Sequence, residues 1–307
     1  FNFKFLVCPF HSSGFFKRIY NCVWAFCNQG EINHISGDIN FISLFLNKSK
    51  TINTFLDCYG LVRLSGFKRV IHKYFWFYLP IKNSTYVTTI SNFSKKELKK
   101  FINIKKKIHV ISAFLPDANY KLKRNVKKNK ILIIGTTKNK NLDRILISIK
   151  DIKTEVIIIG KINENQIKYL RENKINYKNY INVSENVLMS FYNQAMVLLF
   201  PSLYEGFGLP IIEAQKMCVP VITSNISPMK EIVNKSAILV NPKDINDIKK
   251  KLKNICFDSK LRKTIIKRGY VNSLNFNPKA FRKQYFDLYE KIFRKSLENG
   301  KKSKIID

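Results

Sequence analysis

Short apolar runs alternate with segments of helical periodicity throughout the second half of the chain, and this alternation restricts the fold more than any other feature. The runs KILII (130–134) and VIII (156–159) each stop directly before a glycine. Between them, leucine and isoleucine residues recur at helical spacing over residues 141–150. Continuous apolar strands separated by helices are typical of a parallel sheet that is covered on both faces. The second half is therefore predicted to be a doubly wound, Rossmann-like α/β domain.

The first half repeats this pattern less regularly. Its apolar runs predict strands, and two longer stretches, at 15–27 and 67–79, are predicted to be helices. The chain is thus expected to form two Rossmann-like, doubly wound α/β domains that face a cleft, with ligands at the carboxyl ends of the strands. The predicted strands of the first half are 3–7, 32–35, 51–56, 86–91 and 108–112.

Composition divides the chain further. Residues 116–129 are polar and basic and lack periodicity, so this segment is predicted to link an N-terminal domain (1–115) to a C-terminal domain (130–275). The remaining residues, 276–307, are expected to form an amphipathic helix and a tail. One face of this helix is apolar, so it is expected to pack against another surface of the protein that buries it. That face carries Phe281, Tyr285, Leu288, Tyr289 and Ile292.

The turn after the run MVLLF reads PSLYEGFGLPIIEA (201–214) and combines glycines with a proline. Pro210 suits the first turn of a helix because it lacks an N–H group. Gly206 and Gly208 permit a sharp bend and a close approach of the backbone to a ligand. The bend is expected to present free N–H groups at a helix N-terminus, which is a site suited to a phosphate. These N–H groups are those of Phe207, Gly208 and Leu209.

Two carboxylates flank this turn. Glu213 is predicted to lie in the first turn of the helix, leaning back toward the N-terminus, and Glu205 lies on the strand side. Carboxylates accept hydrogen bonds from vicinal hydroxyls such as those of a ribose, so the turn as a whole fits a nucleotide-sugar. A purely structural interpretation stays open, because a glutamate in a first helical turn favours the helix dipole without a ligand and Gly-x-Gly turns are common.

The spacing of these two carboxylates, E-x7-E, resembles the signature of the retaining family 4 glycosyltransferases, which have the GT-B fold. The segments IGTTKNKNLDRI (134–145) and VPVITSNISPMKEI (219–232) resemble motifs of that family's second domain. The resemblance covers most of the chain and is nearest to bacterial enzymes that build cell-surface polysaccharides. It implies a retaining, hexosyltransferase-type enzyme that moves a sugar from a nucleoside diphosphate to an acceptor hydroxyl, without a metal or a cofactor.

The resemblance also implies roles for individual residues. Glu205 would contact the donor sugar, Glu213 would hold the ribose hydroxyls and Lys140 would bind the phosphates, with Glu205 and Lys140 as the catalytic residues. Many relatives carry an arginine directly after the glycine of the first loop, where this chain has Thr136, so Lys140 would act with help from hydroxyl and amide groups. An ordinary solvated lysine is the alternative for Lys140. The expected donor-binding residues are Gly135, Thr136, Gly206, Phe207, Gly208, Leu209 and Glu213.

The first domain is expected to serve the acceptor, a saccharide or a lipid-linked molecule. By resemblance, His34 in NHISGD and Asp57 in TFLDC would lie on the acceptor side. The family usually has a histidine directly before this aspartate, whereas this chain has Leu56, which can neither hydrogen-bond nor carry a proton. The strand, glycine-rich loop and helix with which relatives begin are also expected to be missing. A degenerate nucleotide-binding relative and a nucleotide-sugar epimerase on the same fold therefore remain alternatives.

A formal net charge of +34, from 55 basic and 21 acidic residues, raises the question of polyanionic partners. The lysines are scattered over both halves without a nucleic-acid-binding motif, so no nucleic-acid partner is predicted. The stretch 66–80 mixes basic and aromatic residues and is a candidate for binding an anionic membrane surface. The six cysteines include no CxxC pair. We therefore expect a cytoplasmic protein, peripheral on the inner face of the membrane if the basic helix binds lipid.

Overall fold

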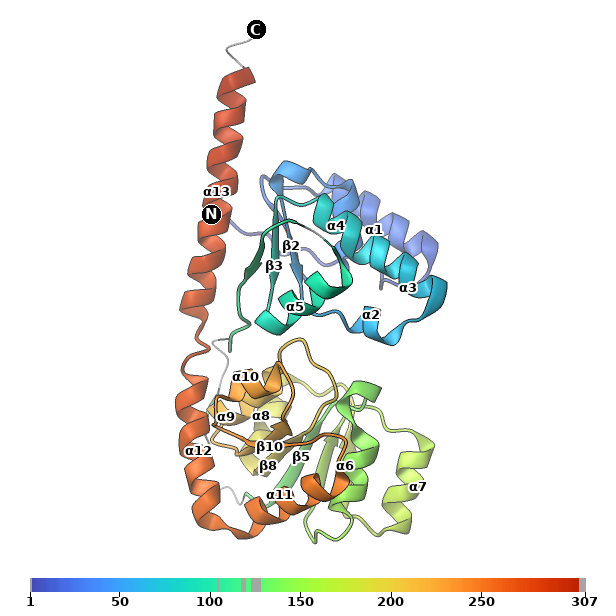
Figure 1. Ribbon diagram of the computed structural model, residues 1–307, viewed down its shortest axis with the longest axis vertical. Coiled ribbons are helices and arrows are strands. Elements are labelled where there is room, and N and C mark those ends of the chain that lie inside the picture. Colours follow the sequence, from blue (N-terminus) through green and yellow to red (C-terminus); the bar gives the residue numbers. More distant parts are fainter. Residues whose placement is uncertain (1, 104, 117–119, 123–127, 304–307) are drawn as a thin grey trace. The chain divides into compact units, whose positions relative to one another are not determined.

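The computed structural model describes residues 2–103, 105–116, 120–122 and 128–303, and it divides into two compact units (Figure 1). The first unit comprises Phe1–Ser112 together with Lys279–Asp307, and the second comprises Ala113–Pro278. The C-terminal segment therefore belongs to the first unit and does not stand alone. Part of the predicted linker, residues 117–119 and 123–127, lies outside the described residues.

The first unit contains a parallel sheet whose strands follow one another in sequence order, with no reversal of that order. The predicted strands at 32–35, 51–56, 86–91 and 108–112 are confirmed, and so is the helix at 15–27. The strands are β1 (Asn33–Ile35), β2 (Thr51–Phe55), β3 (Tyr86–Thr89) and β4 (Ile108–Val110). The α-helices are α1 (Phe15–Cys27), α2 (Tyr59–Arg63), α3 (Gly66–His72), α4 (Leu79–Lys82) and α5 (Asn92–Phe101). There are also two 3₁₀ helices, η1 (Asn40–Phe45) and η2 (Lys48–Lys50), and a π-helix, η3 (Lys73–Tyr78), that connects α3 to α4.

The predicted strand at 3–7 is wrong, because the structure has no strand over these residues. The side chains of this segment are largely exposed, and Phe5 retains 91% of its accessible surface. Phe3 packs its ring against those of Phe286 and Tyr289, with centroid separations of 5.8 Å in both cases. The segment thus makes side-chain contacts without pairing its backbone to a sheet, and apolar composition alone does not make a strand.

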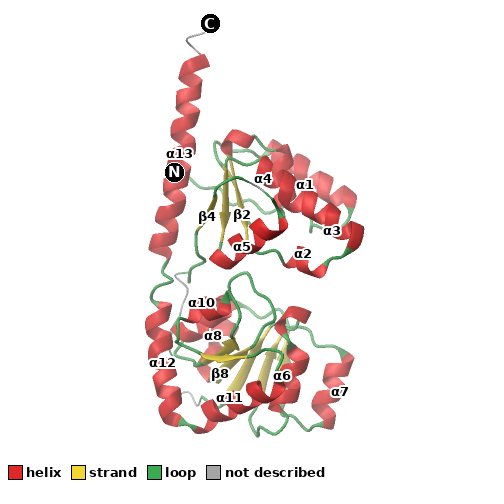
Figure 2. Ribbon diagram, in the orientation of Figure 1, coloured by secondary structure: helices red, strands yellow, loops and turns green. Residues whose placement is uncertain are grey.

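Helix α13 (Pro278–Ser303) covers one face of the first sheet, and α1, α3 and α4 lie on the other side of it (Figure 2). Tyr285, Leu288 and Ile292 of α13 are buried in a cluster with Ile52 of β2 and Ile111. The predicted amphipathic helix is therefore confirmed, and the surface that it covers is the sheet of the first unit. Side chains alternate along β2, so Ile52 faces α13 whereas Phe55 faces the opposite cluster.

The second unit contains a six-stranded parallel sheet in the order β10-β9-β8-β5-β6-β7. The strands are β5 (Lys130–Ile134), β6 (Val156–Ile159), β7 (Tyr177–Tyr180), β8 (Ala195–Phe200), β9 (Val221–Ser224) and β10 (Ile238–Val240). The helices are α6 (Leu142–Ile149), α7 (Glu164–Glu172), α8 (Glu185–Gln194), α9 (Leu209–Lys216), α10 (Met229–Val233), α11 (Ile245–Phe257) and α12 (Ser259–Ser273), with the 3₁₀ turn η4 (Lys138–Lys140). This alternation of strands and helices confirms the predicted Rossmann-like domain.

Both faces of the second sheet are buried. Ile131 and Ile133 of β5 join a cluster with α6, α7 and α11, while the intervening Leu132 points the other way and is also fully buried. β5 and β8 are neighbours in the middle of the sheet. The strands that follow β5 in the chain, β6 and β7, lie on one side of this pair, and the strands that follow β8, β9 and β10, lie on the other side. The loops that follow these two strands diverge at this point, and in open parallel sheets such a switch point is where ligands bind.

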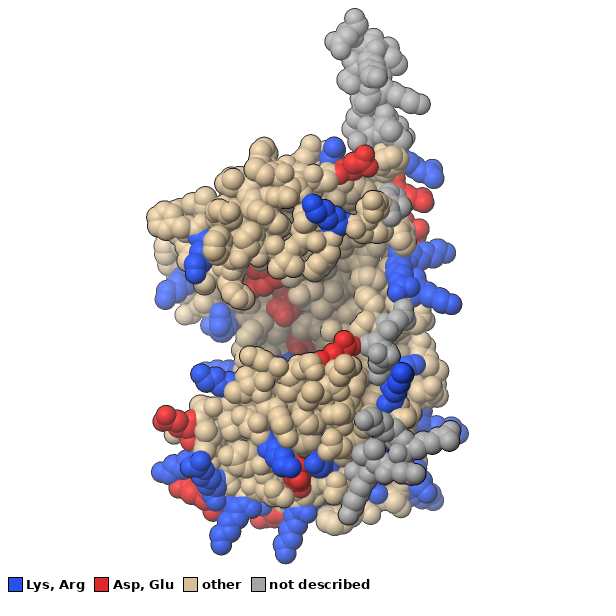
Figure 3. All heavy atoms as spheres, turned by 180° about the vertical axis from the view of Figure 1, so that it is seen from behind, with Lys and Arg blue, Asp and Glu red and all other residues tan. Residues whose placement is uncertain are grey.

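Charged side chains are spread over the surface. On the face shown in Figure 3, Lys and Arg lie in small groups around each unit and do not merge into a single patch. Among the helices of the described ranges, none combines the length and apolar character needed to cross a membrane.

Candidate functional site

Two loops meet at the switch point of the second sheet: residues 135–141 after β5, and 201–208 after β8. Backbone and side-chain hydrogen bonds join them. Leu203 N–H donates to the carbonyl of Asn139 (2.7 Å), and the Asn139 amide donates to the carbonyl of Tyr204 (3.0 Å). Asn141 is buried and donates from Nδ2 to the Pro201 carbonyl (3.0 Å). The two loops are thus fixed to one another before any ligand binds.

Asn139 and Asn141 were not among the residues predicted from the sequence. Asn141 has a left-handed backbone (φ 64°) and is the N-cap of α6. An asparagine directly before a helical pattern is a recognised cap signal, and asparagine tolerates the left-handed region better than most residues. That signal could have identified its position, although not its bond to the neighbouring loop.

The structure brings the two predicted catalytic residues into contact. Lys140 Nζ lies 2.7 Å from Glu205 Oε1, and it also lies 4.7 Å from the centre of the Phe200 ring. The side chain of Glu205 is only 11% exposed. Lys140 is therefore a positioned cation at the switch point, and the interpretation of this residue as an ordinary solvated lysine is not supported.

Gly135 makes room for Lys140. Its φ is +88°, and a Cβ atom built on it would lie 2.9 Å from Cε of Lys140. A larger residue would therefore strain the backbone and push the lysine side chain away. The hydroxyl of Thr136 donates to the carbonyl of Lys161 (2.7 Å), in the loop after β6. The donor-binding role of Thr136 stays a prediction.

The turn after β8 ends in a helix N-terminus, as expected. Gly208 is the N-cap of α9 with φ 117°, and Leu209 is the first helical residue. Gly206 is buried, and the ring of Phe207 packs edge-on against Phe276 at 5.8 Å. Within the described ranges, the N–H groups of residues 207–209 have no hydrogen-bond acceptor in the protein. They remain available to an anion.

Glu213 does not lie in the first turn of α9, so that prediction was wrong. The helix begins at Leu209, which places Glu213 beyond its first turn. Its carboxylate nevertheless lies beside that turn, because the Tyr192 hydroxyl is 2.8 Å from Glu213 Oε2 and 3.4 Å from the Pro210 carbonyl oxygen. Burial raises the pKa of Glu213 above its ordinary value, and the Tyr192 hydrogen bond acts in the opposite direction.

The two residues predicted for the acceptor side lie in the first unit. Both ring nitrogens of His34 lie within hydrogen-bond distance of a hydroxyl group. Nδ1 lies 2.7 Å from the Tyr289 hydroxyl, and Nε2 lies 2.7 Å from Thr54 Oγ1. Burial lowers the pKa of His34 to about 4, so the ring is neutral. Tyr289 of α13 engages Nδ1 and Thr54 of β2 engages Nε2, so both ring nitrogens have partners within the first unit, and the role of His34 toward an acceptor stays a prediction.

Asp57 and Leu56 follow directly after β2. Asp57 Oδ1 accepts a hydrogen bond from the N–H of Tyr59 (2.8 Å) at the start of α2. Burial and the neighbouring charge of Asp57 raise the pKa of Asp38. The side chain of Leu56 is 38% exposed. Asp38 and Asp57 thus lie near one another in the first unit, and the cations of Arg63 and Arg18 oppose the rise in the pKa of Asp38.

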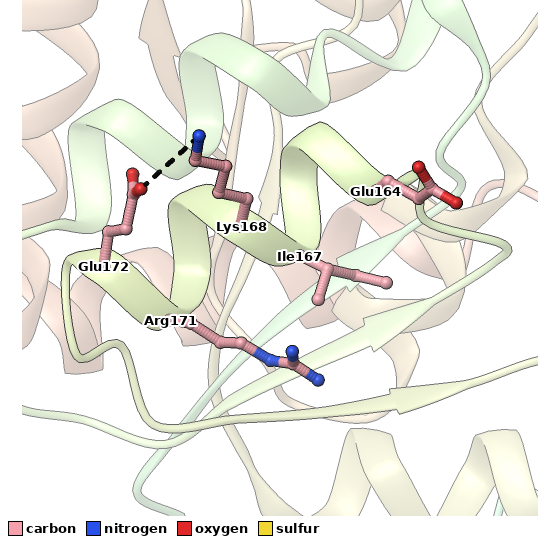
Figure 4. Close-up of a pocket in the computed structure, with 5 residues that line it drawn as sticks. All are labelled: Glu164, Ile167, Lys168, Arg171 and Glu172. Carbon is pink, nitrogen blue, oxygen red and sulfur yellow. Dashed lines mark ion pairs between the residues drawn. The ribbon is translucent and has the colours of Figure 1, made fainter.

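A shallow hollow on α7 is not part of this site. Its lining residues are Glu164, Ile167, Lys168, Arg171 and Glu172, with an ion pair of 3.8 Å between Lys168 and Glu172 (Figure 4). All five side chains come from one helix, so the hollow lacks converging groups from a second element. Across the described ranges there is also no group of three or more His, Cys, Asp and Glu residues placed to hold a metal ion.

The model of the family described as "Glycosyl transferases group 1" matches residues 117–272, which is slightly more than half of the chain. The chain belongs to this family. The match covers both loops of the switch point, including Lys140, Glu205 and Glu213. In this group 1 glycosyltransferase chain, the matched residues therefore lie within the second unit.

Similar proteins are known among bacterial surface-polysaccharide enzymes. The chain is 27% identical over 225 residues to the O-antigen chain mannosyltransferase RfbU of Salmonella typhimurium. The aligned residues make up 70% of this chain and 62% of the relative. It is 34% identical over 107 residues to O-antigen chain mannosyltransferase B of Escherichia coli, covering 35% of this chain and 28% of the relative. The group 1 glycosyltransferase chain thus spans less than two thirds of the length of these relatives.

Among solved structures, sucrose-phosphate synthase from Thermosynechococcus elongatus superimposes with a TM-score of 0.74 at 17% identity, covering 90% of this chain and 77% of that one. This likeness identifies the fold of the group 1 glycosyltransferase chain as GT-B, with two parallel-sheet α/β units. It confirms the fold class predicted from the sequence.

Proposed function

We propose that the protein transfers a sugar from a nucleoside diphosphate to an acceptor hydroxyl, with retention of configuration, during the synthesis of a cell-surface polysaccharide. The observation that carries this proposal is the contact of Lys140 with Glu205 beside the free N–H groups of residues 207–209. A cation and three amide donors lie together with a carboxylate at one switch point. The O-antigen mannosyltransferases that the chain resembles support the class of product.

Each group has a role in this reaction. The bond to the diphosphate breaks in the transition state, and the leaving group gains negative charge. Lys140 and the amides at the start of α9 are already oriented, so they stabilise this charge without reorganising. Glu205 binds hydroxyls of the donor sugar, and its ion pair holds Lys140 in place. Glu213 accepts hydrogen bonds from the ribose.

Because these donors neutralise the diphosphate, we propose that the transfer needs neither a metal ion nor a cofactor. The nucleotide-sugar is a substrate and not a resident group. The leaving phosphate itself would then take the proton from the acceptor hydroxyl on the same face of the sugar, which gives retention.

The test is to incubate the purified protein with UDP- and GDP-linked sugars and measure release of the nucleoside diphosphate with and without a saccharide or lipid-linked acceptor. Acceptor-dependent release that Glu205→Gln abolishes supports transfer. Conversion of the donor to an isomer without an acceptor would identify an epimerase instead. Nucleotide binding without turnover would indicate a degenerate relative, and a thermal-shift screen of nucleoside diphosphates would reveal that binding.

A second proposal concerns where the reaction takes place. Helices α1 and α3 expose large apolar side chains, including Phe15, Phe16 and Phe67 with exposed fractions of 70%, 84% and 76%. Basic residues accompany these aromatic side chains. The Arg18 guanidinium of α1 lies 4.7 Å from the Trp76 ring of η3, which directly continues α3, so α1 is a neighbour of the α3–η3 helix. An apolar surface with flanking cations suits an anionic membrane. We propose a cytoplasmic enzyme that binds the inner face of the membrane, where a lipid-linked acceptor would lie.

A further inference from the structure

We propose that Tyr192 is a positioning residue for nucleotide recognition: its hydroxyl fixes the carboxylate of Glu213 so that the remaining oxygen can accept the ribose hydroxyls. The inference rests on the proposed function, in which Glu213 holds the ribose. Tyr192 lies on α8 and Glu213 on α9, so the contact joins two helices of the second unit.

The geometry leaves one carboxylate oxygen for the ligand. Tyr192 is completely buried, and its hydroxyl oxygen lies 2.8 Å from Glu213 Oε2 and 3.4 Å from the Pro210 carbonyl oxygen. A tyrosine hydroxyl donates only one proton, and the shorter contact to a charged acceptor is the stronger one. In the described part of the chain, Oε1 of Glu213 has no hydrogen-bond partner. Oε2 is therefore held by the protein and Oε1 is available to the ribose.

The electrostatic surroundings make this one hydrogen bond important. Glu205 has the cation of Lys140 beside it, but Glu213 has no comparable ion pair in the described ranges. The groups that face Glu213 are Tyr192 and Glu185 from α8 and Tyr120 from the segment before β5. Burial and the charge of Glu185 raise the pKa of Glu213, and the Tyr192 hydrogen bond opposes this rise. Tyr192 thus helps to keep Glu213 ionised, which is the form that only accepts hydrogen bonds.

The experiment is to measure binding of UDP and GDP to Tyr192→Phe by calorimetry, and to compare the tighter-binding nucleotide with its 2′-deoxy form. Removing the hydroxyl should weaken binding of the ribonucleotide about tenfold, because the Glu213 carboxylate would no longer be held in the orientation that the ribose needs. The preference for ribose over deoxyribose should shrink. The loss of affinity on acidification should also begin at a higher pH than in the wild type, because the pKa of Glu213 rises further without its donor.

Two controls separate positioning from a general structural effect. Tyr169→Phe deletes the same hydroxyl from a partly buried tyrosine on α7 and should leave affinity and the pH profile unchanged. In a Glu213→Gln background, Tyr192→Phe should cause little further loss, because the two residues act as one unit.

The outcomes are distinguishable. Unchanged affinity, ribose preference and pH profile in Tyr192→Phe would overturn the inference while leaving the proposed function intact. An equal loss in the Glu213→Gln background would also overturn it, since Tyr192 would then act independently of Glu213. Failure of the wild-type protein to bind any nucleoside diphosphate would overturn the proposed function, and this inference with it.

Discussion

Lys140 Nζ and Glu205 Oε1 lie 2.7 Å apart, although the two residues come from different loops and are 65 positions apart in the chain. The pair is held from several sides: Phe200 lies under the ammonium group, and the hydrogen bonds of Asn139 and Asn141 tie the loops together. The cation is therefore in place before the diphosphate arrives. Preorganisation of this kind is what makes a charged group effective in a transition state.

Replacing this cation should reduce transfer strongly. In Lys140→Met the leaving diphosphate loses one preorganised donor, so the rate of sugar transfer should fall about 10²-fold or more. Acceptor-dependent nucleotide release measures this rate. Lys138→Met is the matched control, because Lys138 is an exposed lysine in the same turn. Equal losses in the two variants would contradict a specific role for Lys140.

Gly135→Ala should impair transfer through Lys140. Alanine at φ +88° is strained, and its Cβ would lie 2.9 Å from the Lys140 side chain, which must then move. The control is Gly14→Ala in the first unit, where φ is +85° but no atom lies within 4 Å of the added Cβ. Both variants should lower stability by about 1–2 kcal/mol from backbone strain. Only Gly135→Ala should also reduce transfer, and an equal reduction in both would argue against displacement of the lysine.

Acid should destabilise the first unit through His34. The pKa of His34 is about 4 in the folded chain and about 6.5 when unfolded, so the unfolded state binds more protons between these values. The free energy of unfolding therefore contains the full contribution of neutral His34 above pH 6.5 and loses it as the pH falls to about 4. For the pKa shift of His34, this loss is about 3 kcal/mol.

Urea unfolding at pH 7.5 and pH 4 measures this effect. His34→Gln should remove that part of the pH dependence, because glutamine does not titrate. His11→Gln, at an exposed position of the same unit, should retain it. If His34→Gln kept the full acid sensitivity of the wild type, the destabilisation would come from other groups.

Membrane binding should depend on the apolar face of α1 and α3. The double variant Phe16→Glu with Phe67→Glu removes two highly exposed aromatic side chains, so it should fold normally but bind anionic vesicles much more weakly. Cosedimentation with phosphatidylglycerol vesicles at low salt measures this, and high salt should weaken wild-type binding as well. Phe257→Glu is the control, because Phe257 is 82% exposed at the end of α11 in the second unit. Undiminished binding by the double variant would refute this surface.

Local patterns in the sequence predicted most of the second unit. Strands β5 and β6 are continuous apolar runs that stop directly before a glycine, and their central side chains are buried on both faces of the sheet, so composition and burial agree there. The segment at 3–7 has a similar composition but no pairing strand. A strand needs a partner as well as apolar side chains, and a partner cannot be identified from one segment alone.

The site was predictable only where its signals are local. Lys140, Glu205 and the turn at 206–209 each follow a strand, and the sheet brings their loops together. The contact between Tyr192 and Glu213 joins two helices through side chains 21 positions apart, and no local pattern marks it. The contact of His34 with Tyr289 has no local signal for the same reason, because the two residues are 255 positions apart.

The packing of α13 on the first sheet has a consequence for biosynthesis. Ile52 of β2 is covered by side chains near residue 288, so this sheet cannot bury that face until almost all of the chain described here has left the ribosome. The second unit ends at Pro278, so its sheet and its covering helices α11 and α12 can assemble before the rest of α13 is translated. The N-terminal half is therefore the last part to mature, and an early stop before α13 would damage the unit translated first.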